Sequence, residues 1–266
     1  MPHDPLTPAD IARQVQRHAD AWRRAGVEYV SASSPPIATP AVPDQPSPTS
    51  LPLIQSSLFG PESNETDAES LTPEQRREQL TALAARVAEC ALCPHLAATR
   101  TQTVFGVGPI DPELCFIGEA PGANEDAQGK PFVGEAGQLL NRILAACGMR
   151  REEVFICNIL RCRPPNNRQP NPEEAENCRP FLEKTLELVR PRYICALGST
   201  AAQYLLGTRL GIGRLRVRFH DYRGIPVLCT YHPAFLLPTR SPEKKKDVWE
   251  DMKKLLARMG RRIPRK

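Results

Sequence analysis

The sequence predicts an α/β fold in which a mostly parallel sheet is covered by helices on both faces. Short apolar runs alternate along the chain with longer segments of helical periodicity, as in strand–helix–strand units. One apolar run, 114–117, leads directly into a Gly/Pro-rich and acidic segment, 117–137, which a helical pattern follows. Ligands of open α/β sheets bind where loops leave the carboxyl ends of strands. Residues 117–137 are therefore the candidate site around which the chain is organised.

The predicted α/β region begins at Thr72, which can cap a helix. Pro73 takes the first position of this helix, and Gln75 completes a capping box. Further strands are expected at 154–158, 192–197 and 226–230, and further helices at 138–147, 172–190, 200–206 and 243–259. Residues 214–219 alternate between arginine and apolar side chains. This alternation predicts another strand, with Arg214, Arg216 and Arg218 on its polar face.

Two segments precede this region. Residues 1–30 predict a short amphipathic helical segment. Residues 31–70 predict a disordered acidic linker, because 31–61 hold eight prolines and seven serines, and the whole stretch has five acids and no Lys or Arg. Such a composition buries too little apolar surface to offset chain entropy.

Within that linker, residues 55–59 resemble the short peptide by which bacterial proteins bind the DNA sliding clamp. The resemblance lies in Gln55 and in the pair Leu58 and Phe59. Docking into a clamp groove would explain two exposed apolar side chains in a disordered segment. Chance similarity, or packing of this pair on the folded domain, are the alternatives.

Length and charge limit the function classes. The 266 residues suffice for one α/β domain with extra segments. The net charge is only +5, but residues 240–266 carry eleven Lys or Arg against four acids. This basic end predicts contact with a polyanion, although such tails are often only solvated.

The sequence also predicts a cytoplasmic protein with no membrane partner. No apolar run approaches the roughly 20 residues that a membrane span needs. The first residues lack the basic start and apolar core of a secretory signal. In the cytoplasm the nine cysteines are not expected to form disulfides.

Glycine and proline give the 117–137 segment the character of a ligand-binding loop. Gly118 and Gly122 permit close approach of the backbone to a ligand. The Gly129-Lys130 pair superficially suggests a phosphate-binding P-loop. That reading fails, because the spacing is too long and Pro131 replaces the Ser or Thr that would hold magnesium.

Four cysteines have the spacing of metal ligands: Cys90 and Cys93 form a C-x2-C pair, and Cys162 and Cys178 follow in polar, arginine-flanked surroundings. The spacing alone leaves a four-cysteine zinc site, a four-iron cluster and no metal all open. The other five lie in apolar segments, where cysteine acts as a small hydrophobe: Cys115, Cys147, Cys157, Cys195 and Cys229.

Residues 72–258 resemble family 4 uracil-DNA glycosylases, the iron–sulfur branch of their superfamily. The matching motifs are Gly118-Glu-Ala-Pro-Gly122, Pro131-Phe-Val-Gly134, Asn158 before Cys162-Arg-Pro-Pro165, and His232-Pro233 before Leu236-Leu237. The resemblance implies a three-layer sandwich around a mostly parallel four-stranded sheet, with a glycosylase domain at 71–260 and a basic tail at 261–266. A branch that crosslinks to its product has a basic insertion not seen near Asn158, so hydrolytic turnover is expected.

The resemblance implies that the protein hydrolyses the N-glycosidic bond of uracil in DNA and leaves an abasic site. It implies a [4Fe-4S] cluster on Cys90, Cys93, Cys162 and Cys178. The implied catalytic residues are Glu119 and His232, and the implied uracil-binding residues are Gly118, Gly122, Phe132, Asn158 and His232. The chain is expected to act as a monomer on single- or double-stranded DNA.

For DNA contact, Leu236 is expected to fill the gap left by the flipped base, and Arg214, Arg216 and Arg218 to hold phosphates. Two alternatives remain at this point. One is a non-catalytic DNA-binding or polymerase-associated module with the same fold and cluster. The other is a glycosylase that acts mainly on another deaminated base.

Overall fold

The computed structural model describes residues 71–264. The helical segment expected in 1–30, the linker and the clamp-like residues 55–59 lie outside the described residues. Within the described residues, no helix is long and apolar enough to cross a membrane.

A five-stranded sheet with strand order β2-β1-β3-β5-β4 forms the centre of the fold. Its strands are β1 (Leu114–Gly118), β2 (Phe155–Asn158), β3 (Tyr193–Leu197), β4 (His220–Tyr222) and β5 (Ile225–Thr230). The four strands β2, β1, β3 and β5 are parallel, which confirms the mostly parallel α/β sheet. The short β4 adds an antiparallel edge to this expected set of four.

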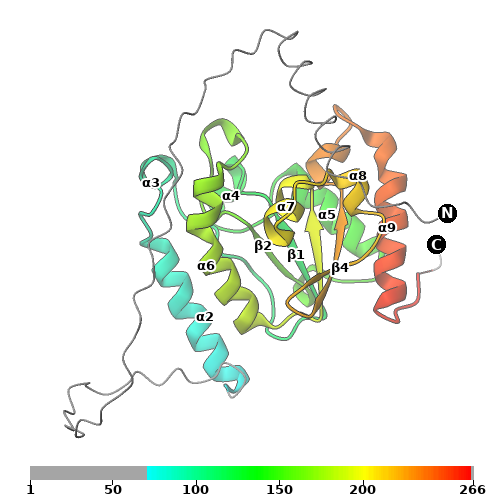
Figure 1. The fold of residues 1–266 in the computed structure, drawn as a ribbon, viewed down its shortest axis with the longest axis horizontal. Helices are drawn as coiled ribbons and strands as arrows, with labels where there is room; N and C mark the ends of the chain where they lie inside the picture. The colour runs from blue at the N-terminus through cyan, green and yellow to red at the C-terminus, as the bar shows by residue number, and fades with distance from the viewer. Residues whose placement is uncertain (1–70, 265–266) are drawn as a thin grey trace, which may run out of the picture. The chain divides into compact units, whose positions relative to one another are not determined.

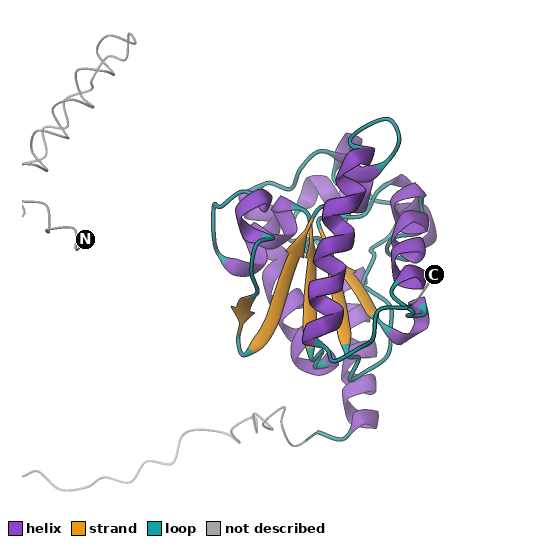
Figure 2. Ribbon diagram, turned by 90° about the vertical axis from the view of Figure 1, so that its right-hand side faces the viewer, coloured by secondary structure: helices purple, strands orange, loops and turns teal. Residues whose placement is uncertain are grey.

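Helices cover both faces of the sheet, which gives three layers (Figure 2). On one face Cys115 and Ile117 pack against α6 (Pro172–Val189) and α7 (Ser199–Leu206). On the other face Leu114 and Phe116 pack against α5 (Glu135–Ala146) and α9 (Lys245–Arg258). Successive side chains of a strand point to opposite faces of the sheet. Because all five residues of β1 are buried, both faces of the sheet must be covered.

The expected start of the helix α2 (Pro73–Ala88) is confirmed, and this helix lies along α6 outside the sheet layers (Figure 1). The Thr72 hydroxyl accepts the N–H of Gln75 at 3.3 Å, and the Gln75 side chain accepts the N–H of Thr72 at 2.8 Å. The short helices α3 (Pro94–Thr99), α4 (Ala123–Gln128) and α8 (Ile212–Leu215) were not expected. All five cysteines assigned to the core are buried: Cys115, Cys147, Cys157, Cys195 and Cys229.

The strand expected at 214–219 is wrong. The segment contains the end of α8 and a turn, and only the following residues enter β4. Alternation predicts a strand only when the apolar residues share one buried face. Here Leu215 is buried, whereas Val217 is 68% exposed. Arg216 is drawn inward instead, where its Nε donates to the buried carboxylate of Asp251 in α9 at 2.8 Å.

Candidate active site

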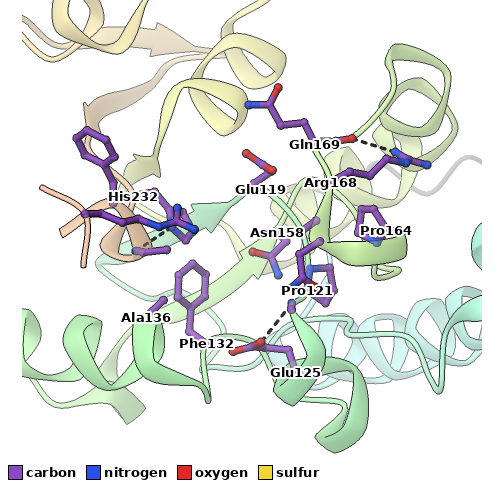
Figure 3. A pocket seen from close by; sticks show the side chains of 16 residues that line it. Glu119, Pro121, Glu125, Phe132, Ala136, Asn158, Pro164, Arg168, Gln169 and His232 are labelled. Carbon is purple, nitrogen blue, oxygen red and sulfur yellow. Dashed lines mark hydrogen bonds between the residues drawn. The ribbon is translucent and has the colours of Figure 1, made fainter. Parts of the chain in front are cut away.

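A cavity of about 410 Å³ lies at the carboxyl ends of the parallel strands. Gly118 and Asn158 are paired in register, so Glu119 and Asn158 lie on adjacent strand ends, and His232 follows the end of β5. Figure 3 shows these side chains and Phe132 around one central space. The lining residues include Glu119, Gly122, Glu125, Phe132, Asn158, Arg168, Gln169, His232, Phe235 and Arg240. Five expected site residues therefore meet in one cavity: Glu119, Gly122, Phe132, Asn158 and His232.

Asn158 brings an unpaired polar atom to this cavity. Its side chain is 2% exposed, and its Oδ1 has no hydrogen-bond partner among the described residues. Gly118 lies directly against it: a Cβ there would overlap Oδ1 and lie 2.6 Å from the ring of Phe132. An unsatisfied buried acceptor costs about 1–3 kcal/mol. Such an atom at a cavity wall points to a ligand that donates a hydrogen bond.

Phe132 forms an aromatic wall beside Asn158. Its φ of 51° is rare for a residue with a side chain, so surrounding contacts must hold it. The Arg151 guanidinium donates to the Pro131 carbonyl at 2.5 Å, and Gly137 packs so closely on the Phe132 carbonyl that a Cβ there would overlap it. The ring lies 5.5 Å from that of His232, at 33°. The ring is thus fixed at the cavity, available to a planar ligand.

Glu125 organises the loop that carries Phe132. Its carboxylate accepts the backbone N–H groups of Gly122 at 3.1 Å and of Val133 and Gly134 at 2.9 Å each. The N–H of Gly122, a residue that the resemblance places among those binding uracil, is therefore occupied by Glu125. At Gly118 the lack of a side chain lets Asn158 and Phe132 approach each other.

His232 presents a neutral imidazole with a defined tautomer. Its Nδ1 accepts the N–H of Ala234 at 3.1 Å, so the ring proton of the neutral form resides on Nε2. Burial and, to a smaller extent, the positive charge of Arg240 together lower the pKa of His232 from 6.5 to about 4, against the opposing charge of Glu125. The side chain is therefore a neutral hydrogen-bond donor at neutral pH.

Glu119 contributes a carboxylate to the same space. Its backbone carbonyl accepts the N–H of Leu160 at 3.0 Å, which fixes the residue at the end of β1. None of the described residues donates a hydrogen bond to its carboxylate, and Figure 3 shows that group directed into the cavity. The site thus combines one free carboxylate, one neutral donor, one unpaired amide and one aromatic face.

Sequence reasoning missed the opposite wall, which the loop 163–171 forms. Arg168 lines the cavity and is held by Glu174, whose oxygens accept from its two terminal nitrogens at 2.9 and 2.5 Å. Arg168 holds the pKa of Glu174 at about 2, with help from the N–H of Asn171 and from His95. The available signal was the Asn-x-x-Glu spacing at the start of α6, which is typical of a capping box.

Comparison with known proteins identifies the family. Residues 105–253 match the model of the uracil DNA glycosylase superfamily. The chain belongs to this superfamily. It is 44% identical over 181 residues to a type-4 uracil-DNA glycosylase of Thermotoga maritima, covering 67% of this chain and 94% of the relative. It is 40% identical over 195 residues to the type-4 enzyme of Archaeoglobus fulgidus, covering 70% and 96%. A type-5 uracil-DNA glycosylase of Mycobacterium leprae is 30% identical over 218 residues, covering 65% and 94%. The resemblance to family 4 is thus confirmed.

In this type-4 family member the four candidate metal ligands come from three places: Cys90 and Cys93 after α2, Cys162 after β2, and Cys178 within α6. Burial raises the pKa of Cys162, and the charges of Cys90 and Cys93 raise it further. Burial likewise raises the pKa of Cys178 to about 11, with contributions from Cys162 and Cys93. Ionisation of Cys162 is thus opposed by Cys90 and Cys93, and ionisation of Cys178 is opposed by Cys162 and Cys93.

The surroundings of these thiols fit an anionic group. Arg100 donates to the sulfur of Cys162 at 3.1 Å, and the positive charge of the buried Arg161 favours ionisation of Cys178. Within residues 71–264, no three or more Cys, His, Asp or Glu side chains are close enough to hold a single metal ion. In an iron–sulfur cluster each thiolate binds a different iron. Four thiols with nearby arginines have the chemistry of the ligands of such a cluster.

Of the residues expected to contact DNA, the structure leaves two exposed and makes two inaccessible. Leu236 is 1% exposed and packs in the core with α5, so it cannot reach a base stack in this conformation. Arg216 is also unavailable to phosphate, because Asp251 and the backbone carbonyl of Asp247 accept its hydrogen bonds. Arg214 and Arg218 are exposed. The amphipathic pattern identified the segment but could not show which arginine a buried carboxylate would hold.

Proposed function

We propose that this chain removes uracil from DNA by hydrolysing its N-glycosidic bond and leaving an abasic site. One observation carries the proposal: Asn158, whose buried Oδ1 is unpaired, lines a cavity that is also lined by the Phe132 ring and the neutral donor of His232. Uracil supplies the missing partner, because its N3–H is a donor between two carbonyl groups. The names of the type-4 relatives support the same substrate.

Recognition requires the base to leave the helix, at a cost of a few kcal/mol. In the cavity the ring of Phe132 stacks on the base. Asn158 accepts from N3–H through Oδ1 and donates from Nδ2 to O4. Cytosine has an acceptor at N3 and a donor at the neighbouring exocyclic position, so both hydrogen bonds would be mismatched.

Catalysis then depends on charge that develops as the glycosidic bond breaks. The base departs as an anion, and the Nε2–H of His232 donates to its O2. A donor oriented before the reaction stabilises such charge more effectively than water does. The Glu119 carboxylate acts on the sugar side, where an anion can orient the attacking water and stabilise the cationic sugar.

A [4Fe-4S] cluster on Cys90, Cys93, Cys162 and Cys178 completes the proposed protein. When bound, it would connect α2, the segment after β2 and α6, a structural role that requires no change of redox state. A Cys178→Ser variant should contain less iron per protein and absorb less visible light than the wild type. Cys147→Ser, which changes a buried cysteine outside this set, is the matched control and should retain the iron content. Equal iron in both variants would refute the ligand assignment.

DNA binding is proposed for the exposed Arg214 and Arg218, with help from Lys244–Lys246. Residues 55–59 are proposed to bind the sliding clamp through Gln55, Leu58 and Phe59. A peptide of residues 50–63 should bind purified clamp, and the double variant Leu58→Ala/Phe59→Ala should not. Light scattering of the full chain would test the proposed monomer.

The deciding experiment is base release from a uracil-containing oligonucleotide, with thymine and cytosine oligonucleotides as controls. Release of uracil alone is the expected result, and Glu119→Gln should be far slower while binding the same DNA. Release of another deaminated base at a higher rate would change the substrate. DNA binding without base release from any substrate would overturn the proposed activity and favour a binding module.

A further inference from the structure

We propose that Phe235, rather than Leu236, is the side chain that enters the DNA base stack when the target base leaves it. The inference rests on the proposed uracil excision and assigns the wedge residue, meaning the apolar group that fills the vacated position. Enzymes that extrude bases commonly use such inserted apolar side chains. The two neighbours differ in where their side chains lie.

Burial separates the two candidates. Leu236 is 1% exposed and lies in the core cluster formed with α5 and α9. Leu236 and Trp249 also line a separate apolar groove between α5 and α9. Phe235 is 39% exposed and lines the candidate uracil cavity. Only Phe235 is therefore both accessible to DNA and next to the space that the flipped base would occupy.

The backbone holds Phe235 in a fixed position. Both residues belong to a short 3-10 helix, Pro233–Leu236, directly after His232. The N–H of Phe235 donates to the His232 carbonyl at 2.9 Å, and its own carbonyl accepts the N–H of Ser241 at 3.0 Å. Phe235, at the rim of the cavity, is thus fixed relative to His232, the proposed donor to the departing base.

The ring of Phe235 packs against a second aromatic ring. Tyr231 stacks on it, with ring centroids 5.5 Å apart and an angle of 27°. The guanidinium of Arg216 lies 5.2 Å from the Tyr231 ring centroid, and the ammonium of Lys244 lies 5.9 Å from it. Arg216 is itself fixed by Asp251. Arg216, which Asp251 keeps from binding phosphate, thus packs on the Tyr231 ring of this aromatic pair.

A wedge should matter most where the target base is paired and stacked. Extrusion is easiest for a mismatched base or a single strand. The contribution of the wedge residue is therefore measured by one ratio: kcat/KM on a duplex with a U:A pair divided by kcat/KM on the single strand. Because one preparation is assayed on both substrates, any loss of folded protein cancels in this ratio.

The test compares Phe235→Ala, Phe235→Trp and Leu236→Ala in the full chain. Phe235→Ala should lower the duplex-to-single-strand ratio by roughly 10- to 100-fold, the range expected for loss of one aromatic–base stack. Phe235→Trp should keep the ratio near that of the wild type. Leu236→Ala should lower the melting temperature, because it opens a cavity in the core, without changing the ratio.

A second substrate makes the result specific to insertion. A pyrene nucleotide opposite the uracil fills the stack itself, so it should restore most of the duplex activity that Phe235→Ala loses. An unchanged ratio in Phe235→Ala, or a lowered ratio in Leu236→Ala alone, would overturn the proposal. Absence of uracil release by the wild type from both substrates would instead refute the underlying glycosylase function.

Discussion

The Nδ1 atom of His232 accepts the backbone N–H of Ala234 at 3.1 Å, which leaves Nε2 as the proton-bearing atom of the neutral ring. The same contact caps the 3-10 helix that carries Phe235. One side chain thus provides both the donor that we propose acts on the base and the cap of the segment at the cavity rim. The two effects can be separated by substitution.

Replacement of His232 by Asn should reduce catalysis with little loss of fold. The Asn oxygen can still accept the Ala234 N–H, since Asn is a favoured cap, but the Nε2 donor is gone. Removal of one donor to a developing anion typically lowers kcat by about 10²–10³-fold. Single-turnover release of uracil measures this effect, and thermal melting provides the control. Full activity in this variant would contradict the role of His232.

The lowered pKa of His232 also predicts how stability depends on pH. Its pKa is about 4 in the folded chain against an ordinary 6.5, because burial and then Arg240 disfavour the charged form. Between these values the unfolded state binds more protons than the folded state, so stability falls as pH falls. The contribution of His232 is complete above pH 6.5 and is lost towards pH 4.

Denaturant unfolding at pH 7.5 and pH 5 would measure this linkage. The wild type should lose more unfolding free energy between the two values than His232→Asn, whose residue 232 does not titrate. Equal losses would show that the ring is not held neutral by the fold.

Gly118→Ala should damage the site through shape alone. The new Cβ would lie 2.6 Å from the Phe132 ring and overlap the Asn158 oxygen. Overpacking of this kind costs about 1–3 kcal/mol of stability, and displacement of both recognition groups should raise KM and lower kcat. Gly213→Ala is the matched control, because a Cβ there meets no atom within 4 Å. Similar kinetics for both variants would contradict the close packing of this wall.

The resemblance to family 4 supplied Glu119, Asn158 and His232 as candidate site residues, and local signals in the sequence explain why they lie near one another. Glu119, Asn158 and His232 all follow apolar runs, and parallel strands bring such positions to one edge of the sheet. The Gly/Pro content of the loop also indicated that Phe132 would lie near them. These inferences needed only the alternation of strands and helices along the chain, which local patterns indicate and which predicts a mostly parallel sheet.

Burial of individual side chains on irregular segments could not be predicted in the same way. Leu236 and Phe235 are adjacent apolar residues, and only the packing of α5 and α9 decides which one enters the core. Arg216 alternates with two other arginines, but the distant Asp251 removes it from the surface. Each outcome depends on a partner far away in sequence, which no local pattern encodes.

Arg161 connects the uracil cavity to the cysteines, and its loss should affect both. The buried guanidinium donates to the carbonyls of Phe105 at 2.6 Å and Asn158 at 3.2 Å and to the Thr185 hydroxyl at 3.0 Å. Its charge also favours the thiolate of Cys178. Hydrogen bonds to a charged group contribute about 1.5–3 kcal/mol each, and they are not additive.

Arg161→Met should therefore lower the unfolding free energy by about 3 kcal/mol, reduce the iron content per protein and raise KM for uracil-containing DNA. Arg163→Met is the matched control, because this arginine lies on the other side of Cys162 and, among residues 71–264, donates only to the Asn167 side chain, at 2.8 Å. Metal analysis, melting and steady-state kinetics on both variants would separate the two positions. If Arg163→Met lost as much iron as Arg161→Met, general positive charge near Cys162 would explain the effect, and the specific link from Asn158 to the cysteines would be wrong.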